Sequence, residues 1–310
     1  MQFVALGCRA GISQRLIYGI NAGESAALDN QARTSAGCEP SRPITRGARM
    51  NDISVKVDQG VALISLNRPE TRNAIDVAMI RAFQSVLDTL ERSETGARAL
   101  VLTGGLDAFC SGMDLHSIDL SAKEARQRGH FAMRSFMDPL ILRLSAFRMP
   151  IIAAVHGAAV GAGLSLALAC DIIIAADDAS FHPSFCRLGM VPDAGITFHL
   201  ARRIGGGRAL SSLLLAEPIN AKTALLWGLA YETLPKSQVL ARSRAIALRL
   251  AKGPLTVLAQ IRSLQTSAFN HSLEQQLRDE RFAQQSMADM TDCFEGVSAF
   301  FEKREAHFTV

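Results

Sequence analysis

The stretch IIAAVHGAAVGAGLSLALACDIIIAA, residues 151–176, is almost entirely apolar and small, and only His156 and Asp171 within it are able to carry a charge. Its first twenty residues have the length of a helix that crosses a bilayer. Seven of these are alanine and three are glycine, however, and such a segment inserts poorly compared with a leucine-rich one. A Gly-x-Gly pair begins at Gly161, as in a dinucleotide-binding loop, but Leu166 stands where a third glycine is needed.

The remaining interpretation of this stretch is a strand, a glycine-containing turn, a short buried helix and a second strand. Alanine and glycine allow another group to approach the backbone closely. The first N–H groups of a helix have no partner inside the helix, so the turn can hold an oxyanion. A second loop of similar composition, AFCSGMDL at residues 108–115, follows another apolar strand and offers a second set of donors.

The segments on the N-terminal side of this stretch alternate between strand and helix. Residues 53–69, ISVKVDQGVALISLNRP, alternate in two runs around Asp-Gln-Gly and predict a hairpin. Apolar residues recur at three and four after Asp76, which predicts an amphipathic helix over 77–92 with Asp76 as its N-cap. A buried strand at 99–103 and a helix over about 125–147 follow. This alternation indicates an α/β layered fold.

The C-terminal part of the chain is predicted to be helical. Gly253-Pro254 begins one helix, with Pro254 expected at its first position. Ser272 and Gln275 have the spacing of a capping box ahead of another helix. No segment repeats at a fixed period.

Composition narrows the function classes. The chain has 310 residues, 48% of them hydrophobic and 20% charged, which is an ordinary globular balance. Its 33 Lys and Arg against 29 Asp and Glu leave a net charge of +4, too small and dispersed to indicate nucleic acid. The six cysteines form no CxxC pair, so we expect free thiols, a reducing compartment and no structural metal.

Residues 1–49 differ from the rest of the chain. They contain six arginines and no lysine, with scattered glycine, serine and proline and no helical or strand period. We interpret them as an N-terminal extension outside the fold. Three origins stay open, namely an organelle transit peptide, a disordered tail, and translated upstream sequence with Met50 as the true start.

Five motifs occur in one order along the chain: LNRPETRNAID at 66–76, AFCSGMDL at 108–115, PIIAAVHGAAVGAGLSLALACD at 150–171, FCRLGMVPDAG at 185–195 and EGVSAFFEKREAHF at 295–308. Together they resemble the crotonase, or enoyl-CoA hydratase/isomerase, superfamily over residues 50–310. The resemblance implies a crotonase-type (ClpP/crotonase-like) α/β spiral of ββα units over 50–252 and a helical oligomerisation region over 253–310. It also implies a homotrimer or hexamer in the cytoplasm, or in a mitochondrial or peroxisomal matrix in a eukaryote.

The resemblance also implies a site for an acyl-CoA thioester, with no further cofactor, no nucleic acid and no membrane. The backbone N–H groups of Met113 and Ala162 take the positions of the two donors that stabilise an enolate. Lys303 is expected to reach the ligand of a neighbouring subunit, and Asp114 to hold its own loop. The candidate substrate- or CoA-binding positions are Arg72, Ala74, Ser111, Gly112, Asp114, Leu115, Gly161, Ser165, Phe185 and Lys303.

The acidic residues favour one reaction among those of the superfamily. The two glutamates of its hydratases align with Ser165 and Phe185, neither of which is acidic. Asp193 remains, at a position where several isomerases of the superfamily have an acidic base. A 1,3 proton shift needs only one carboxylate. We expect burial beside Phe185 and Val191 to raise the pKa of Asp193.

Several alternatives stay open. A hydratase would use Asp193 with another water-positioning group, and a ring-opening isomerase would act on CoA esters of aromatic degradation. Hydrolysis and decarboxylation also occur on this scaffold. A Ser165–His182–Asp193 triad lacks the Gly-x-Ser-x-Gly elbow, and we interpret His156 and His199 as structural. A non-catalytic acyl-CoA binder is the alternative of another class.

The segment from Ser117 to Arg134 borders the acyl pocket in the superfamily. We expect Phe131 and Met133 either to line that pocket or to pack within a helix. This segment does not fix the length or branching of the acyl chain.

Overall fold

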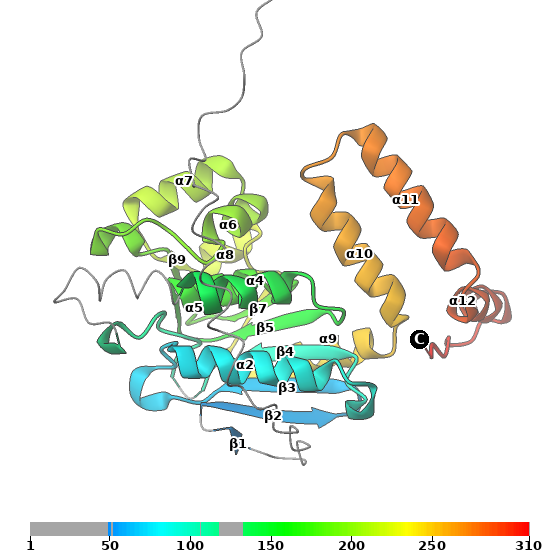
Figure 1. Ribbon diagram of the computed structural model, residues 1–310, viewed down its shortest axis with the longest axis horizontal. Coiled ribbons are helices and arrows are strands. Elements are labelled where there is room, and N and C mark those ends of the chain that lie inside the picture. The colour runs from blue at the N-terminus through cyan, green and yellow to red at the C-terminus, as the bar shows by residue number, and fades with distance from the viewer. Residues whose placement is uncertain (1–48, 51, 106, 118–132, 310) are drawn as a thin grey trace, which may run out of the picture. The chain divides into compact units, whose positions relative to one another are not determined.

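The computed structural model describes residues 49–50, 52–105, 107–117 and 133–309. Residues 44–310 form one compact unit, and a seven-stranded sheet lies at its core (Figure 1). The order of its strands is β1-β2-β3-β4-β5-β7-β10. The first three strands pair antiparallel and the others parallel. The strands are β1 (Arg49–Met50), β2 (Ile53–Asp58), β3 (Val61–Leu66), β4 (Ala99–Thr103), β5 (Ile151–Val155), β7 (Ile172–Ala176) and β10 (Glu232–Leu234).

The predicted hairpin is confirmed, since β2 and β3 pair antiparallel with Asp58 opposite Val61. Gln59 and Gly60 form its two-residue turn with φ of 50° and 80°. Two successive left-handed residues match the right-handed twist of the flanking strands, and glycine accommodates this conformation without strain.

The predicted amphipathic helix is also confirmed, as α2 (Val77–Leu90). Asp76 is its N-cap, and one carboxylate oxygen accepts the N–H of Met79 at 2.8 Å. Its buried face consists of the apolar residues that the spacing predicts, namely Met79, Ile80, Phe83, Val86, Leu87 and Leu90.

A second sheet of three strands was not expected from the sequence. It has the order β6-β8-β9, with β6 (Ala158–Val160), β8 (Ser180–His182) and β9 (Ile219–Asn220). Residues 158–160 were predicted as part of a turn. They are extended because β6 pairs in parallel with β8, about twenty residues further along the chain, and this long-range pairing leaves no local pattern in an Ala-Ala-Val segment.

The helices between the strands complete the core. The helix predicted over about 125–147 corresponds to two consecutive elements, a five-residue π-helical segment η4 (Met133–Met137) and the helix α4 (Asp138–Ser145). Its expected start lies outside the described residues. Four short helical turns are η1 (Pro69–Thr71), η2 (Ser93–Thr95), η3 (Leu115–Ser117) and η5 (Phe185–Leu188). The remaining helices of this part are α5 (Ala162–Leu168), α6 (Ile196–Ile204), α7 (Gly206–Leu215), α8 (Ala221–Trp227) and α9 (Lys236–Ala251).

Three helices form the C-terminal part: α10 (Leu255–Ala268), α11 (Leu273–Ala288) and α12 (Thr291–Glu302). The capping box of Ser272 and Gln275 is present at the start of α11, as predicted. Pro254 was expected at the first helical position of α10 but is its N-cap, because its ψ of 102° is extended.

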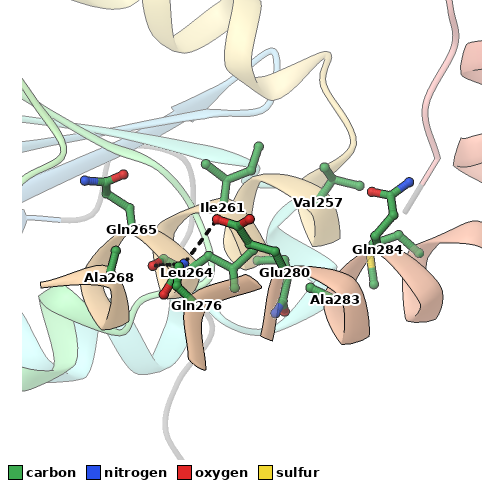
Figure 2. A pocket seen from close by; sticks show the side chains of 11 residues that line it. Val257, Ile261, Leu264, Gln265, Ala268, Gln276, Glu280, Ala283 and Gln284 are labelled. Carbon is green, nitrogen blue, oxygen red and sulfur yellow. Dashed lines mark hydrogen bonds between the residues drawn. The ribbon is translucent and has the colours of Figure 1, made fainter. Parts of the chain in front are cut away.

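An open pocket of about 380 Å³ lies between α10 and α11 (Figure 2). Leu264 and Ala283 are among its apolar lining residues, and Gln276 and Glu280 among its polar ones. Gln276 donates from its side-chain amide to the carbonyl of Leu264 at 3.1 Å and to Glu280 at 3.4 Å. No helix in the described part of the chain is both long and apolar enough to cross a membrane.

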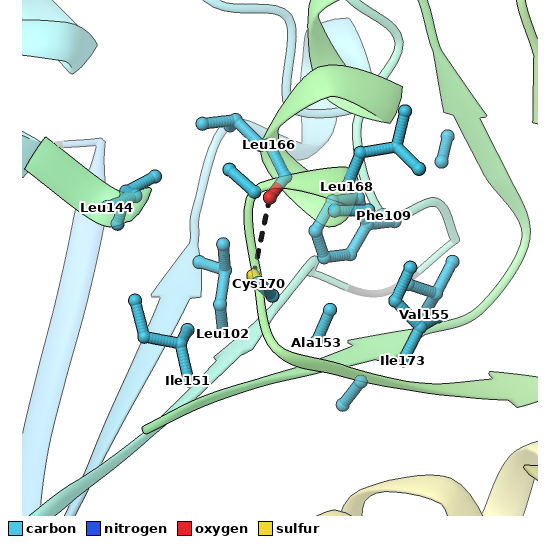
Figure 3. Close-up of a cluster of buried hydrophobic side chains, with 14 of the residues drawn as sticks. Leu102, Phe109, Leu144, Ile151, Ala153, Val155, Leu166, Leu168, Cys170 and Ile173 are labelled. Carbon is cyan, nitrogen blue, oxygen red and sulfur yellow. Dashed lines mark hydrogen bonds between the residues drawn. The ribbon is translucent and has the colours of Figure 1, made fainter. Parts of the chain in front are cut away.

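The stretch at 151–176 contributes much of the buried cluster in Figure 3. Its strands β5 and β7 pair in parallel, and α5 connects them. The thiol of Cys170 donates to the carbonyl of Leu166 at 3.3 Å inside this cluster. The labelled side chains are Leu102, Phe109, Leu144, Ile151, Ala153, Val155, Leu166, Leu168, Cys170 and Ile173.

Candidate active site

A parallel bridge between Ile75 and Met113 joins the loop at 110–114 to the segment after η1. The N–H of Ile75 donates to the carbonyl of Gly112 at 2.7 Å, and the N–H of Asp114 donates to the carbonyl of Ile75 at 2.8 Å. In such a parallel bridge, the middle residue directs its own N–H away from its neighbour. Within the described part of the chain, no hydrogen bond uses the N–H of Met113.

The turn at the start of α5 provides a second unused donor. Gly161 is the N-cap, and its φ of 50° and ψ of −117° strongly favour glycine. Its carbonyl accepts the N–H of Ser165 at 3.0 Å, which fixes the first turn of the helix. Ala162, the first helical residue, is 2% exposed, and its N–H likewise has no partner among the described residues.

The two loops are joined to each other through β6. Cys110 and Ala159 form a parallel bridge, in which the N–H of Cys110 donates to Ala158 and the N–H of Val160 donates to Cys110. A Cβ atom placed on Gly112 would lie 2.9 Å from the carbonyl oxygen of Val160 and 3.8 Å from the nitrogen of Ala162. The structure therefore brings together the two segments that carry the predicted donors.

Four further candidate residues lie on the loop at 110–114, just after it, or on the segment after η1. The N–H of Ser111 donates to the carbonyl of Arg72 at 3.0 Å, and its hydroxyl donates to the carbonyl of Thr71 at 2.8 Å. Arg72 is exposed and has a left-handed φ of 53°. Ala74 is buried, whereas Leu115 is 44% exposed at the start of η3.

Three residues of the site were missed by the sequence analysis, namely Arg68, Asn73 and Cys110. The buried side chain of Asn73 accepts from the N–H of Arg68 and donates to the carbonyls of Ala108 and Phe109. The thiol of Cys110 donates to the carbonyl of Asn73 at 3.0 Å, and burial raises its pKa to about 12. The residues lie inside the quoted motifs, but each also makes a side-chain contact with a segment 35 or more residues away.

The residues at the positions of the hydratase glutamates lie beside the α5 turn. Ser165 is fully buried, and its hydroxyl is 3.4 Å from the carbonyl oxygen of Gly161. The ring of Phe185 lies 3.7 Å from the point where a Cβ of Gly161 would be. Phe185 is 9% exposed and therefore forms an apolar wall on this turn.

The expected burial of Asp193 is not found. Asp193 is exposed, and Val191 is 82% exposed. The reason is that η5 after Phe185 and the loop that follows it, residues 186–191, are exposed, so these residues build no apolar shell around the carboxylate. Ala194, the next residue, is buried with a left-handed φ of 49°, an unfavourable conformation for a residue with a Cβ atom.

The histidines have structural partners. His156 is hydrogen-bonded through Nε2 to the carbonyl of Gly105 at 2.6 Å. The Nε2 atom of His182 bonds to the hydroxyl of Ser180 at 2.9 Å rather than to Ser165, which argues against a Ser165–His182–Asp193 triad. Burial, together with the nearby Arg187, lowers the pKa of His182.

Lys303 lies at the C-cap of α12, exposed and left-handed with a φ of 56°. The hydrogen bonds and ion pairs of the described residues do not join it to the two donor loops. Phe131 lies outside the described residues, as does the side chain of Met133. No group of three or more His, Cys, Asp or Glu side chains in the described part of the chain is arranged to hold a metal ion.

Comparison with known proteins identifies, over most of the chain, the same family that the five sequence motifs resemble. The sequence pattern of the enoyl-CoA hydratase/isomerase family matches residues 56–310. The chain belongs to this family. A Rhodobacter capsulatus protein named "Probable enoyl-CoA hydratase" is 39% identical over 257 residues, covering 83% of this chain and 97% of its own length. The 1,2-epoxyphenylacetyl-CoA isomerase of Escherichia coli is 36% identical over 260 residues, covering 84% and 99%.

Solved structures agree with this enoyl-CoA hydratase/isomerase assignment. A crystal structure of an enoyl-CoA hydratase from Polaromonas sp. JS666 superimposes with a TM-score of 0.79 at 30% identity, covering 83% of this chain and 99% of its own. The crotonase-type α/β fold predicted from the motifs is therefore confirmed. The enoyl-CoA hydratase/isomerase family contains both reaction types among the relatives above, so the family alone leaves the reaction open.

Proposed function

We propose that this member of the family is an acyl-CoA isomerase that moves a carbon–carbon double bond by a 1,3 proton transfer. The thioester oxygen binds between the N–H groups of Met113 and Ala162, and these donors stabilise the negative charge that develops on it. The proximity of the two loops supports this role, because the nitrogen of Ala162 is 3.8 Å from a Cβ position on Gly112, the residue before Met113. The reaction uses the CoA thioester as substrate and needs no other cofactor.

Asp193 is the proposed acid and base. Its carboxylate removes a proton from C2 of a 3-enoyl thioester, and the electron pair passes into the thioester carbonyl to form a dienolate. The same carboxyl group then returns the proton to C4, which leaves the double bond between C2 and C3. A single carboxylate can perform both steps, and such a group contributes roughly 10²- to 10⁴-fold to a rate.

The observation that carries this proposal is the chemical nature of the wall beside the α5 turn. Ser165 is fully buried and Phe185 places a phenyl ring against Gly161. Neither side chain is a carboxylate that can activate water or deliver its proton. An apolar ring at this position disfavours a bound water at the enolate, whereas proton transfer by one acid is unaffected.

Hydration is the second candidate reaction. The exposure of Asp193 favours it, because bulk water reaches that carboxylate directly. A ring-opening isomerisation of aromatic-degradation CoA esters is a third candidate, and the E. coli relative is named a 1,2-epoxyphenylacetyl-CoA isomerase. A non-catalytic acyl-CoA binder would retain affinity for CoA esters after Asp193→Asn and would turn over none of them.

We also propose that copies of the chain assemble as trimers or hexamers. Large aromatic side chains on α12 support this proposal, since Phe294, Phe300 and Phe301 are 64%, 78% and 76% exposed. Exposed aromatic groups of this kind are typical of interfaces between subunits. Sedimentation velocity of the purified protein measures the assembly state, and a stable monomer would contradict the proposal.

The experiment that tests the reaction follows the absorbance of the conjugated thioester with 3-hexenoyl-CoA and, separately, with crotonyl-CoA. The variants are Asp193→Asn and, as a matched control, Asp289→Asn, an exposed aspartate at the end of α11. An isomerase raises the absorbance of the first substrate and leaves the second unchanged. Asp193→Asn abolishes the rise and Asp289→Asn retains it.

Loss of absorbance with crotonyl-CoA would replace the isomerase proposal with hydration. Full activity of Asp193→Asn would remove Asp193 from the mechanism. The non-catalytic binder would be supported by two results together: the absorbance of neither thioester changes, and wild type and Asp193→Asn bind CoA esters with equal affinity.

A further inference from the structure

One arginine connects the loop at 110–114, here called the Met113 loop, to the segment around Ile75. Arg68 lies two residues after the end of β3, and its side chain is 14% exposed. Its Nη1 donates to the carbonyl of Ala74 at 2.8 Å and pairs with Asp76 at 2.9 Å, while its Nη2 pairs with Asp114 at 3.1 Å. Ala74 and Asp76 flank Ile75, and Asp114 follows Met113, so one guanidinium spans the Ile75–Met113 bridge.

We propose that Arg68 is a positioning residue that fixes the direction of the Met113 N–H, acting through Asp114 and the segment around Ile75. This inference rests on the proposed function, in which that N–H binds the thioester oxygen. Arg68 does not act on the substrate itself. It holds the two chain segments whose main-chain hydrogen bonds orient the Met113 peptide.

The geometry explains why an arginine is needed. The two nitrogens Nη1 and Nη2 contact three different groups on two segments, and a lysine ammonium is a single point charge that cannot span them. Asp52 and Glu70 lie 4.0 Å and 3.8 Å from the Nε atom, so the cation also compensates two further carboxylates. Removal of the charge would leave the largely buried Asp114 beside other acids without this partner.

Oxyanion stabilisation is sensitive to such positioning. Loss of one donor typically costs about 10²- to 10³-fold in kcat. A donor that is present but misdirected should cost less, so we expect Arg68→Lys to lower kcat about tenfold to hundredfold. The KM for the acyl-CoA should stay within about twofold, because the ground-state carbonyl is bound less strongly by the donors than the enolate.

Arg143 provides a matched control. Its guanidinium, 24% exposed, pairs with Asp88 and Glu91 and donates to the carbonyl of Gln84, and it joins α4 to α2 rather than holding a donor loop. Arg143→Lys therefore removes a comparable fork elsewhere in the fold. We expect a similar loss of thermal stability in the two lysine variants but a loss of kcat only in Arg68→Lys.

The deciding readout is the absorbance of bound 2,4-hexadienoyl-CoA, a conjugated thioester whose absorbance moves to longer wavelength when donors polarise its carbonyl. We expect a clear red shift in wild type and Arg143→Lys, and less than half of that shift in Arg68→Lys. Asp114→Asn keeps the shape of the side chain but removes its charge, and it should reduce the shift in the same direction. If Arg68→Lys does not fold, Asp114→Asn alone decides the question.

The possible results separate the two proposals. A full red shift in Arg68→Lys would overturn the positioning role and leave the proposed function intact. If Arg68→Lys does not fold, a full red shift in Asp114→Asn has the same meaning. A wild-type protein that binds the thioester without any red shift would overturn the donor pair itself, and with it both proposals.

Discussion

Cys110 and Gly163 lie so close together that residue 163 has no room for a side chain. A Cβ atom on Gly163 would be 2.6 Å from the Cβ atom and carbonyl oxygen of Cys110 and 2.7 Å from its sulfur. Distances below 3.0 Å require one of the two segments to shift. Because Cys110 belongs to the Met113 loop and Gly163 to the α5 turn, this contact sets the spacing of the two loops.

We therefore expect Gly163→Ala to destabilise the protein by about 1–3 kcal/mol, as overpacking of a well-packed core does, and to lower kcat. Urea unfolding and steady-state kinetics measure both effects. Gly207→Ala in α7 is the control, because nothing lies within 4 Å of its Cβ position. That substitution should be neutral or stabilising by up to about 1 kcal/mol. Wild-type stability and kcat in Gly163→Ala would contradict the close contact.

The cysteines should differ widely in reactivity. Burial raises the pKa of Cys110 and of Cys170 to about 12, so their thiolates are scarce at neutral pH. Cys186 is exposed. Brief treatment of the native protein with iodoacetamide, followed by peptide mass mapping, should show modification of Cys186 and almost none of Cys110 or Cys170. All three should react in denaturant, and rapid native labelling of Cys110 would contradict its burial.

His199 should make stability depend on pH. Burial, with a smaller effect of Arg203 and Arg202, lowers the pKa of His199 from 6.5 to about 4. The unfolded chain then binds this proton at a higher pH than the folded protein does. The contribution of His199 to stability is therefore present above pH 6.5 and is lost as the pH falls through 6.5 toward 4.

The measurement is the free energy of unfolding between pH 7.5 and pH 4.5 for wild type and His199→Gln. The variant should lose less stability over this range, because glutamine binds no proton. His307→Gln, the same substitution at an exposed position, is measured alongside as the control. Identical slopes for wild type and His199→Gln would show that His199 does not contribute.

An ion pair anchors α10 to the main sheet. One oxygen of Asp171 accepts the N–H of Ile151 at 2.6 Å, and the other accepts Nε of Arg262 at 2.7 Å. Arg262 also donates to the carbonyl of Leu144 at 3.0 Å, and its side chain is 12% exposed. Charge-assisted hydrogen bonds in a partly buried setting are worth about 1.5–3 kcal/mol each.

A double-mutant cycle with Asp171→Ala and Arg262→Ala should therefore give a coupling energy above about 1 kcal/mol. The exposed pair of Arg242 and Glu232, with side chains 44% and 30% exposed, is the comparison and should give about 0.5 kcal/mol or less. Thermal unfolding at several salt concentrations measures both. Equal coupling energies in the two pairs would contradict the anchoring role.

Much of the fold was predictable because its elements have local patterns. The helix α2 has an N-cap at Asp76 and six apolar positions on one face, and the β2–β3 hairpin has a Gln59-Gly60 turn. The strand β6 at 158–160 has neither signal. Its extended conformation depends on pairing with β8, which no local pattern reveals.

The candidate site was predictable in its main chain and less so in its side chains. The motifs located the loops of Met113 and Ala162, and the structure brings these loops together. The role of Arg68 depends on Asp114, 46 residues further along the chain, and a single sequence does not show that contact. The exposure of Asp193 was also missed, because apolar neighbours in sequence such as Val191 point to burial, whereas the loop leaves them exposed.

Both proposed donors are main-chain groups, and the bridges that hold them use only backbone atoms of Cys110, Ile75 and their partners. The side chain of Met113 takes no part in these bridges, although it packs against the hydrophobic core, so a substitution there changes packing but does not remove the proposed donor. Under the proposed function, a small library at this one position, from alanine to phenylalanine, would test whether this side chain limits the acyl chain while the proposed main-chain donor is kept. Position 113 is thus a place where the proposed donor and the choice of substrate can be tested separately.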